Sequence, residues 1–172
     1  NDIKRFEQLF SSNATTFIAL DAGFIMDMFE NPIVVVPTNN AEQGMFLLQD
    51  LTRPMVTSFD LNMTTELLVI NFNETVSIAN FDVTQISLQK SSSVTDFAAN
   101  QYSLTAGSVL VGGSIDDPFI TIKLSLDDMN ELKRKKIARL SGTTWLVITE
   151  DMLFDQNNKK VVPLVNSQDA MP

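Results

Sequence analysis

The side chains that could carry out chemistry in this sequence are carboxylates and asparagines, because its 172 residues include neither cysteine nor histidine. That composition excludes thiol nucleophiles, the usual zinc sites and Ser-His-Asp triads. Asp60 and Glu74 are the pair to consider for glycoside hydrolysis, which uses two facing carboxyl groups. Both fall among predicted strands, and nothing in the sequence marks a substrate cleft near them. We therefore predict no enzyme and no catalytic residue.

Three acidic pairs offer the oxygen ligands that Ca²⁺ prefers: Asp116-Asp117, Asp127-Asp128 and Glu150-Asp151. None of them has the spacing of a known calcium loop. Aspartate is also common where helices and turns begin, because its carboxylate accepts hydrogen bonds from backbone N–H groups. We expect these residues to cap helices and form turns, with no metal and no cofactor bound. Calcium dependence remains an alternative without a supporting motif.

Three asparagines stand in Asn-x-Thr sequences, the acceptors of N-linked glycans: Asn13, Asn62 and Asn73. Asn13 and Asn62 fall in predicted turns, where a glycan can extend into water, and Asn73 falls at the end of a predicted strand. N-linked glycans are expected here if the protein is secreted by a eukaryote, and not if it comes from an ordinary bacterium.

The net charge of −9 and the pI near 4.3 argue against nucleic-acid binding, which depends on contacts between cations and phosphates. The one basic run, residues 133–136, suits the end of a helix, where cations complement the helix dipole. We expect no membrane span, since no stretch of 18 apolar residues occurs. Without an initiating methionine or a signal-peptide pattern at Asn1, the sequence reads as a window on a longer or processed polypeptide.

Short apolar stretches separated by turn residues dominate the chain and predict strands. A helix is expected after Ser125 or Asp127, with Met129 and Leu132 facing inward, and another over residues 1–10. Strands are expected near residues 16–20, 33–36, 45–51, 55–61, 66–72, 81–88, 102–104, 109–111, 119–124, 145–149 and 161–165. Strands at this spacing predict an all-β fold, a β-sandwich with Greek-key connections and one short helix.

The sequence also matches itself over about 35 positions. Residues 1–5 (Asn-Asp-Ile-Lys-Arg) correspond to residues 130–134 (Asn-Glu-Leu-Lys-Arg), 129 positions later, and residues 15–20 correspond to residues 143–148 at a distance of 128. A period this long suits a tandem array of whole domains rather than a solenoid. We predict that residues 1–44 are the C-terminal part of a preceding repeat, a helix plus a β-hairpin. Residues 45–172 would then be one complete repeat.

A family resemblance rests on two further features. Residues 72–76 (Phe-Asn-Glu-Thr-Val), which follow an alternating strand, resemble the F-S-E-x-V signature of bacterial-type Ig-like domains in S-layer proteins and large surface adhesins. Residues 27–32 and 155–158 are similar to the late D-x-x-G-N turn of that family, although glycine is absent from both. The resemblance covers roughly residues 54–165. It implies an Ig-like module strung in arrays outside a cell.

The second copy stops at Pro172, the counterpart of Gly44, before any counterpart of residues 45–51. If that segment is a strand that closes a sandwich, neighbouring copies could exchange it head to tail. The exchanged side chains would be Met45, Phe46, Leu47, Leu48 and Leu51. The alternative is that residues 45–51 begin their own domain or form a linker.

The expected function is therefore mechanical: a building block of an extracellular filament or of a surface-adhesin stalk, whose partners are neighbouring copies of the same protein. The alternative is an adhesive binding module that recognises carbohydrate or depends on calcium. Both place the protein outside the cell or on its surface.

Overall fold

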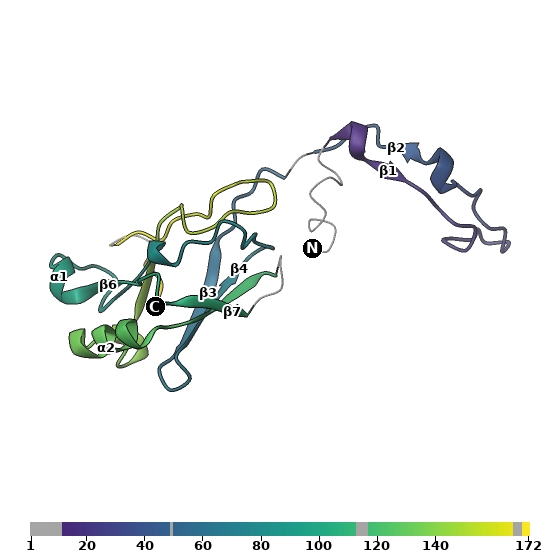
Figure 1. The fold of residues 1–172 in the computed structure, drawn as a ribbon. Coiled ribbons are helices and arrows are strands. Elements are labelled where there is room, and N and C mark those ends of the chain that lie inside the picture. The colour runs from purple at the N-terminus through teal and green to yellow at the C-terminus, as the bar shows by residue number, and fades with distance from the viewer. Residues whose placement is uncertain (1–11, 49, 113–116, 167–169) are drawn as a thin grey trace. The chain divides into compact units, whose positions relative to one another are not determined.

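The computed structural model of the chain describes residues 12–48, 50–112, 117–166 and 170–172. The contacts within the chain divide it into two units, one ending at Leu51 and the other beginning at Thr52 (Figure 1). We call the described residues up to Leu51 the hairpin unit and those from Thr52 onward the β unit. The helix expected over residues 1–10 lies outside the described residues. The predicted module boundary at 44/45 concerns the sequence match and stays a prediction.

The hairpin unit has two short antiparallel strands, β1 (Phe17–Ile18) and β2 (Glu42–Gln43), and two single turns of 3-10 helix, η2 (Asn13–Thr15) and η3 (Thr38–Asn40). Isolated bridges continue the strand pairing between β1 and β2 along the hairpin. Not one described residue between Ser12 and Leu51 is buried. The hairpin unit therefore has no hydrophobic core of its own.

Two antiparallel sheets make up most of the β unit. In the larger sheet the strand order is β3-β4-β8-β7, and in the smaller it is β6-β5-β9. The bounds are β3 Val56–Asn62, β4 Leu67–Phe72, β5 Ile86–Gln89, β6 Gln101–Ser103, β7 Val109–Gly112, β8 Phe119–Lys123 and β9 Trp145–Ile148. A 3-10 turn, η4 (Val83–Gln85), leads into β5, and another, η5 (Ser141–Thr143), precedes β9.

A single hydrophobic core joins the two sheets. In β4, buried and half-buried residues alternate, which places Leu68, Ile70 and Phe72 on one face. Ile120 of β8 pairs with Ile70 across the larger sheet, and both side chains are fully buried. The smaller sheet adds Ile86, Leu88, Leu146 and Ile148 to the same core. The residues that follow β9 add Met152, Leu153, Val161 and Leu164.

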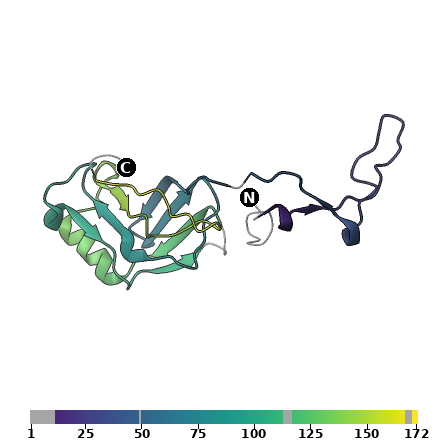
Figure 2. The same ribbon diagram turned by 90° about the horizontal axis from the view of Figure 1, so that it is seen from above.

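The main helix is α2 (Leu126–Lys135), which lies with the short helix α1 (Phe97–Asn100) at the same end of the β unit (Figure 2). The Ser125 side chain caps α2 by accepting a hydrogen bond from the N–H of Asp128. Met129 and Leu132 are fully buried, which confirms the predicted inward face. The helix ends at Lys135, and the next residue, Lys136, caps it with a left-handed backbone at φ 57°.

Lys136→Gly is expected to raise the free energy of unfolding of the β unit by about 0.5–1 kcal/mol. A left-handed conformation costs a residue with a Cβ roughly 1–2 kcal/mol, and the greater freedom of glycine in the unfolded chain offsets part of this gain. Urea unfolding measures the change. The control is Lys133→Gly inside α2, which should lower the free energy by about 1 kcal/mol. Destabilisation by both variants would contradict the role of Lys136.

The structure confirms a largely β chain with antiparallel sheets and one main helix. Each strand predicted between residues 55 and 149 has an observed counterpart within a few residues, although β5 is preceded by a 3-10 turn where a strand pair was expected. Three strand predictions are wrong. Residues 33–36 and 161–165 take part only in isolated bridges, and residues 45–51 form no strand in their described part. The helix α1 was not predicted.

Candidate functional site

Asp128 is the most deeply buried of the acidic candidates, and its contacts are of the kind that stabilise a fold. Its carboxylate is fully buried and accepts hydrogen bonds from the Tyr102 hydroxyl at 2.8 Å, from the Ser108 hydroxyl and from the N–H of Thr105. Burial by itself would raise the pKa of Asp128, but hydrogen bonds from Ser108, Tyr102, Ser125 and Thr105 lower it below its ordinary value. Burial and this carboxylate raise the pKa of the Tyr102 hydroxyl well above its ordinary value. Asp128 thus ties the helix to the segment before β7.

The remaining acidic candidates lie at separate places. Asp127 is exposed in the first turn of α2, and Asp116 is outside the described residues. Asp60 is exposed in β3, whereas Glu74 is buried just after β4. Within the described part of the chain, no three acidic side chains come together as metal ligands would.

The three asparagines of the Asn-x-Thr sequences are all exposed. Asn62 is the last residue of β3, and its Oδ1 accepts from the N–H groups of Thr64 and Thr65 in the turn that follows. Asn13 begins η2, and its side-chain amide donates to the Met45 carbonyl at 3.3 Å. Asn73 differs from the other two because the threonine of its sequence, Thr75, is buried. The surface position suits a glycan at each asparagine, and glycosylation itself stays a prediction.

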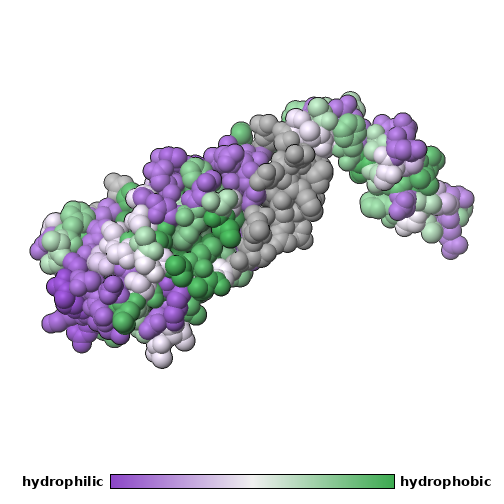
Figure 3. Space-filling view, in the orientation of Figure 1, coloured by the Kyte–Doolittle hydropathy of each residue, from purple (hydrophilic) through white to green (hydrophobic). Residues whose placement is uncertain are grey.

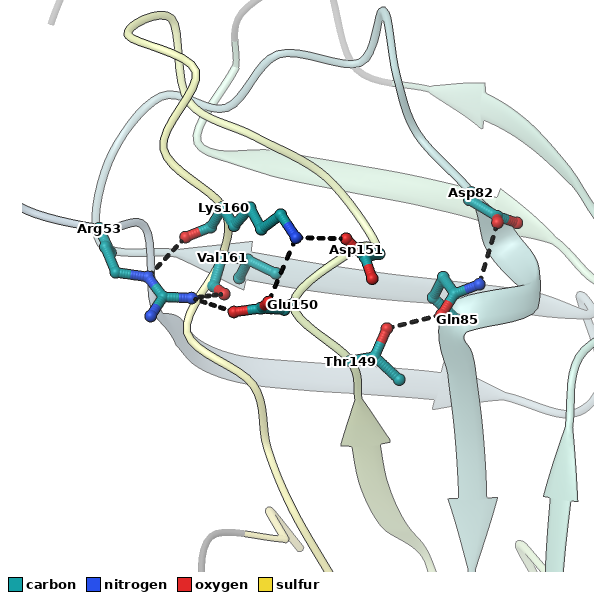
Figure 4. A network of polar contacts seen from close by, with 8 residues as sticks. All are labelled: Arg53, Asp82, Gln85, Thr149, Glu150, Asp151, Lys160 and Val161. Carbon is teal, nitrogen blue, oxygen red and sulfur yellow. Dashed lines mark hydrogen bonds and ion pairs between the residues drawn. The ribbon is translucent and has the colours of Figure 1, made fainter.

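A polar network lies where the chain enters the β unit (Figure 4). Arg53 donates from Nε to the Lys160 carbonyl and from Nη2 to the Val161 carbonyl, both at 2.8 Å, and pairs with Glu150 at 3.2 Å. Lys160 in turn pairs with Asp151 at 2.7 Å and with Glu150 at 3.2 Å. Hydrogen bonds to Asp151 and Glu150 raise the pKa of Lys160. The network holds the first residues of the β unit against its last hairpin.

Arg53→Ala is expected to lower the free energy of unfolding of the β unit by about 1–2 kcal/mol, because two carbonyl groups lose their charged donor. Glu150→Gln is the matched control. It removes only exposed ion pairs and should cost less than about 0.5 kcal/mol. Urea unfolding of both variants provides the comparison. A larger loss for Glu150→Gln would show that the ion pairs, and not the carbonyl contacts, hold this junction.

The proposed exchange segment, residues 45–51, forms no strand in its described part. Met45, Phe46, Leu48 and Leu51 are exposed, and Leu47 is half-buried. Exchange of this segment between copies therefore stays a prediction.

The hairpin unit and the last part of the β unit build the same turn at positions 128 apart. In the first, Asp27 Oδ1 accepts from the N–H groups of Phe29 and Asn31; in the second, Asp155 Oδ1 accepts from the corresponding N–H groups of Asn157 and Lys159. These four distances lie between 2.7 and 2.9 Å. Hydrogen bonds from the Asn31 side chain and from the N–H groups of Asn31 and Phe29 lower the pKa of Asp27.

A left-handed residue occupies the same place in both turns, Glu30 with φ 64° and Asn158 with φ 57°. The left-handed region favours glycine, so both turns hold a residue with a Cβ in a backbone conformation that glycine adopts more easily. The resemblance to a D-x-x-G-N turn stays a prediction.

The backbone pairing that leads into each turn also corresponds. Leu20 and Val36 exchange two hydrogen bonds of 2.9 Å, and their counterparts Ile148 and Leu164 exchange two of 3.1 Å. At the start of each segment, two threonine hydroxyls donate to one carbonyl. These are Thr15 and Thr16 to Ser12 at 3.1 and 2.7 Å, and Thr143 and Thr144 to Leu140 at 3.0 and 2.7 Å.

Burial is where the two segments differ. Ile18, Phe24 and Ile25 are 54%, 69% and 57% exposed. Their counterparts Leu146, Met152 and Leu153 are all fully buried. Apolar side chains accordingly gather on the visible surface of the hairpin unit (Figure 3). We call the following six residues the hairpin face: Ile18, Leu20, Phe24, Ile25, Ile33 and Val36.

Comparisons with protein-family models, with curated proteins and with solved structures find no match to this chain. No helix in the described ranges is both long and apolar enough to cross a membrane. The role of these residues therefore follows from their contacts alone, and those contacts are apolar packing and structural hydrogen bonds. The sequence alone did not indicate the hydrogen bonds of Arg53 or the burial of the Asp128 carboxylate, because both depend on contacts with residues distant in the sequence.

A groove of about 650 Å³ in the β unit is large enough for a small ligand. It runs between β3 and the connection from α2 to β9. Its lining includes Phe59, Asp60, Asn62, Arg139 and Thr144.

Proposed function

We propose that this chain is a building block of an extracellular filament or of the stalk of a surface adhesin, composed of Ig-like β-sandwiches repeated about every 128 residues. The observation that supports this function is the recurrence of the same turn and strand hydrogen bonds at positions 128 apart. A chain that ends two successive units with the same hairpin is organised as an array of modules. Two sheets around one core are consistent with a sandwich in each module.

The acidic surface and the three glycan acceptors suit such an array. A net charge of −9 produces mutual repulsion that keeps modules soluble and apart. Because all three asparagines are exposed, glycans attached to them would extend from the surface of the modules. The partners of each module are then its neighbours in the same array.

Electron microscopy of the protein purified from its source tests the proposal. Linear rows of equal beads are the expected image, and N-glycosidase treatment should lower the mass of the protein. A compact particle without a periodic arrangement would contradict the filament or stalk. A row of beads, together with a protein mass that the glycosidase does not change, would support the array and contradict the N-linked glycans.

The groove beside β3 supports a second candidate, a carbohydrate-binding module. Phe59 offers a ring for stacking, and Asp60, Asn62 and Arg139 offer hydrogen bonds to hydroxyl groups. A glycan array probed with the chain tests it. Because Asn62 lines the groove, a glycan attached there would cover the site, so binding only by the unglycosylated form would argue against a physiological role.

A further inference from the structure

We propose that the hairpin face is the binding surface for a second β unit, one like residues 52–139 that precedes the hairpin in the same polypeptide and lacks a terminal hairpin of its own. This inference rests on the proposed array and adds which residues join one module to the hairpin that completes it. The hairpin unit would then be the last part of a module, held as residues 140–172 are held in the β unit.

The side-chain argument comes from what the counterparts do. Leu146 pairs with Leu88, and Ile148 pairs with Ile86, at the edge of the smaller sheet. Met152, Leu153, Val161 and Leu164 belong to the same core. The hairpin face presents apolar side chains at all six of these positions, on a backbone with the same strand and turn hydrogen bonds. Positions that are buried in the β unit are thus exposed or half-buried in the hairpin unit.

The backbone makes a separate argument. In the β unit, the Phe154 carbonyl accepts from Ser77 N–H at 2.8 Å and the Met152 carbonyl accepts from Asp82 N–H at 2.9 Å. The matching carbonyls are those of Met26 and Phe24, and neither accepts a backbone hydrogen bond from any residue that the structure describes. These two acceptors therefore favour a protein partner that has backbone N–H groups at the positions of Ser77 and Asp82.

These two carbonyls also decide what kind of partner fits. A lipid surface would cover the apolar side chains but would leave the carbonyls without donors, which is costly away from water. A β unit supplies the core, the strand edge of β5 and both donors together. Side chains and backbone thus favour the same occupant.

The test extends the full chain by a copy of its own residues 52–129, placed directly before Asn1. Asn1 corresponds to Asn130 in the sequence match, so the extension supplies the β unit that the hairpin would complete. Because the chain has no cysteine, Phe24→Cys gives one thiol for labelling with a soluble maleimide. We expect that thiol to react at least about 100-fold more slowly in the extended chain than in the 172-residue chain, since labelling would require local opening. Phe29→Cys is the control, because its counterpart Asn157 is exposed, and it should react equally in both chains.

Hydrogen exchange on the extended chain without substitutions gives a second measurement. Amides of the added copy of β5 are expected to be protected. A protected copy with a reactive thiol in the Phe24→Cys variant would overturn the proposal, and so would an unprotected copy. Phe24→Cys could instead react slowly already in the 172-residue chain, with light scattering showing a dimer. That result would mean that a second molecule covers the hairpin face, and it would overturn the proposal that a β unit of the same polypeptide does so. Rows of beads from the native protein would still support the array if Phe24→Cys reacts fast in the extended chain. That combination would contradict only the burial of the hairpin face by a preceding β unit.

Discussion

Replacing Asp128 by asparagine is expected to lower the free energy of unfolding of the β unit by about 3–5 kcal/mol. The carboxylate is fully buried and accepts from a tyrosine hydroxyl, a serine hydroxyl and a backbone N–H. An asparagine keeps the shape but presents an NH₂ group where at least one of these donors points, and it removes the charge that strengthens the others. Urea unfolding followed by circular dichroism measures the loss.

The neighbour Asp127 provides the control, because it is exposed in the same helical turn. Asp127→Asn should cost no more than about 0.5–1 kcal/mol through the helix dipole. Equal losses from the two variants would mean that the buried hydrogen bonds of Asp128 contribute little beyond its charge at the helix N-terminus.

The pKa of Asp128 gives this prediction a dependence on pH. Its pKa is lowered in the folded protein, so the ionised form is bound more strongly there than in the unfolded chain. The resulting stability is present above the unfolded pKa of about 3.9 and is lost as the pH falls through the lowered folded value. The gap in stability between the wild type and Asp128→Asn should therefore narrow on going from about pH 6 to about pH 3. A gap that stays constant over this range would contradict the assignment.

The second large effect is a contrast between Leu153 and its counterpart Ile25. Leu153→Ala should destabilise the β unit by about 3 kcal/mol, because a fully buried side chain leaves a cavity. Ile25→Ala should change the stability of the 172-residue chain by less than about 0.5 kcal/mol, since that side chain is more than half exposed. In the chain extended by residues 52–129, the same Ile25→Ala change should cost about 3 kcal/mol in the added module.

Thermal and urea unfolding of the variants and their parent chains provide the measurements. The sharpest result is the change for Ile25→Ala on adding the extension, because the substitution is identical and only its environment differs. A loss that stays below about 0.5 kcal/mol in a folded extended chain would show that Ile25 is not buried by the added unit.

Strands and the main helix were predictable because their signals are local. The alternation in β4 and the Ser125 cap with Met129 and Leu132 inward can be read within a dozen residues, and the structure shows both. The helix α1 was missed because its four residues follow a serine-rich loop and carry no full apolar period. Its cap, Asp96, is recognisable only once the turn is seen.

The predicted strand at residues 161–165 fails for a reason visible in its hydrogen bonds. The N–H of Val162 donates to the Pro54 carbonyl, and Pro163 has no N–H to offer. Only Leu164 remains to pair with Ile148, so the segment is held at single points. Such distant hydrogen-bond partners, like those of Arg53 and Asp128, are set by the fold and leave no pattern in the local sequence.

The pairing of β5 with β9 has a consequence for synthesis on the ribosome. Residues 86–89 emerge well before residues 145–148, so β5 has one bare edge while the rest of its module is translated. In an array, a hairpin from a neighbouring module has the right backbone to occupy that edge first, and such misassembly is a known failure of repeated domains. Residues 12–48 are made before residues 86–89. If the chain is part of such an array, the order of translation therefore brings the earlier hairpin near that edge before residues 145–148 exist.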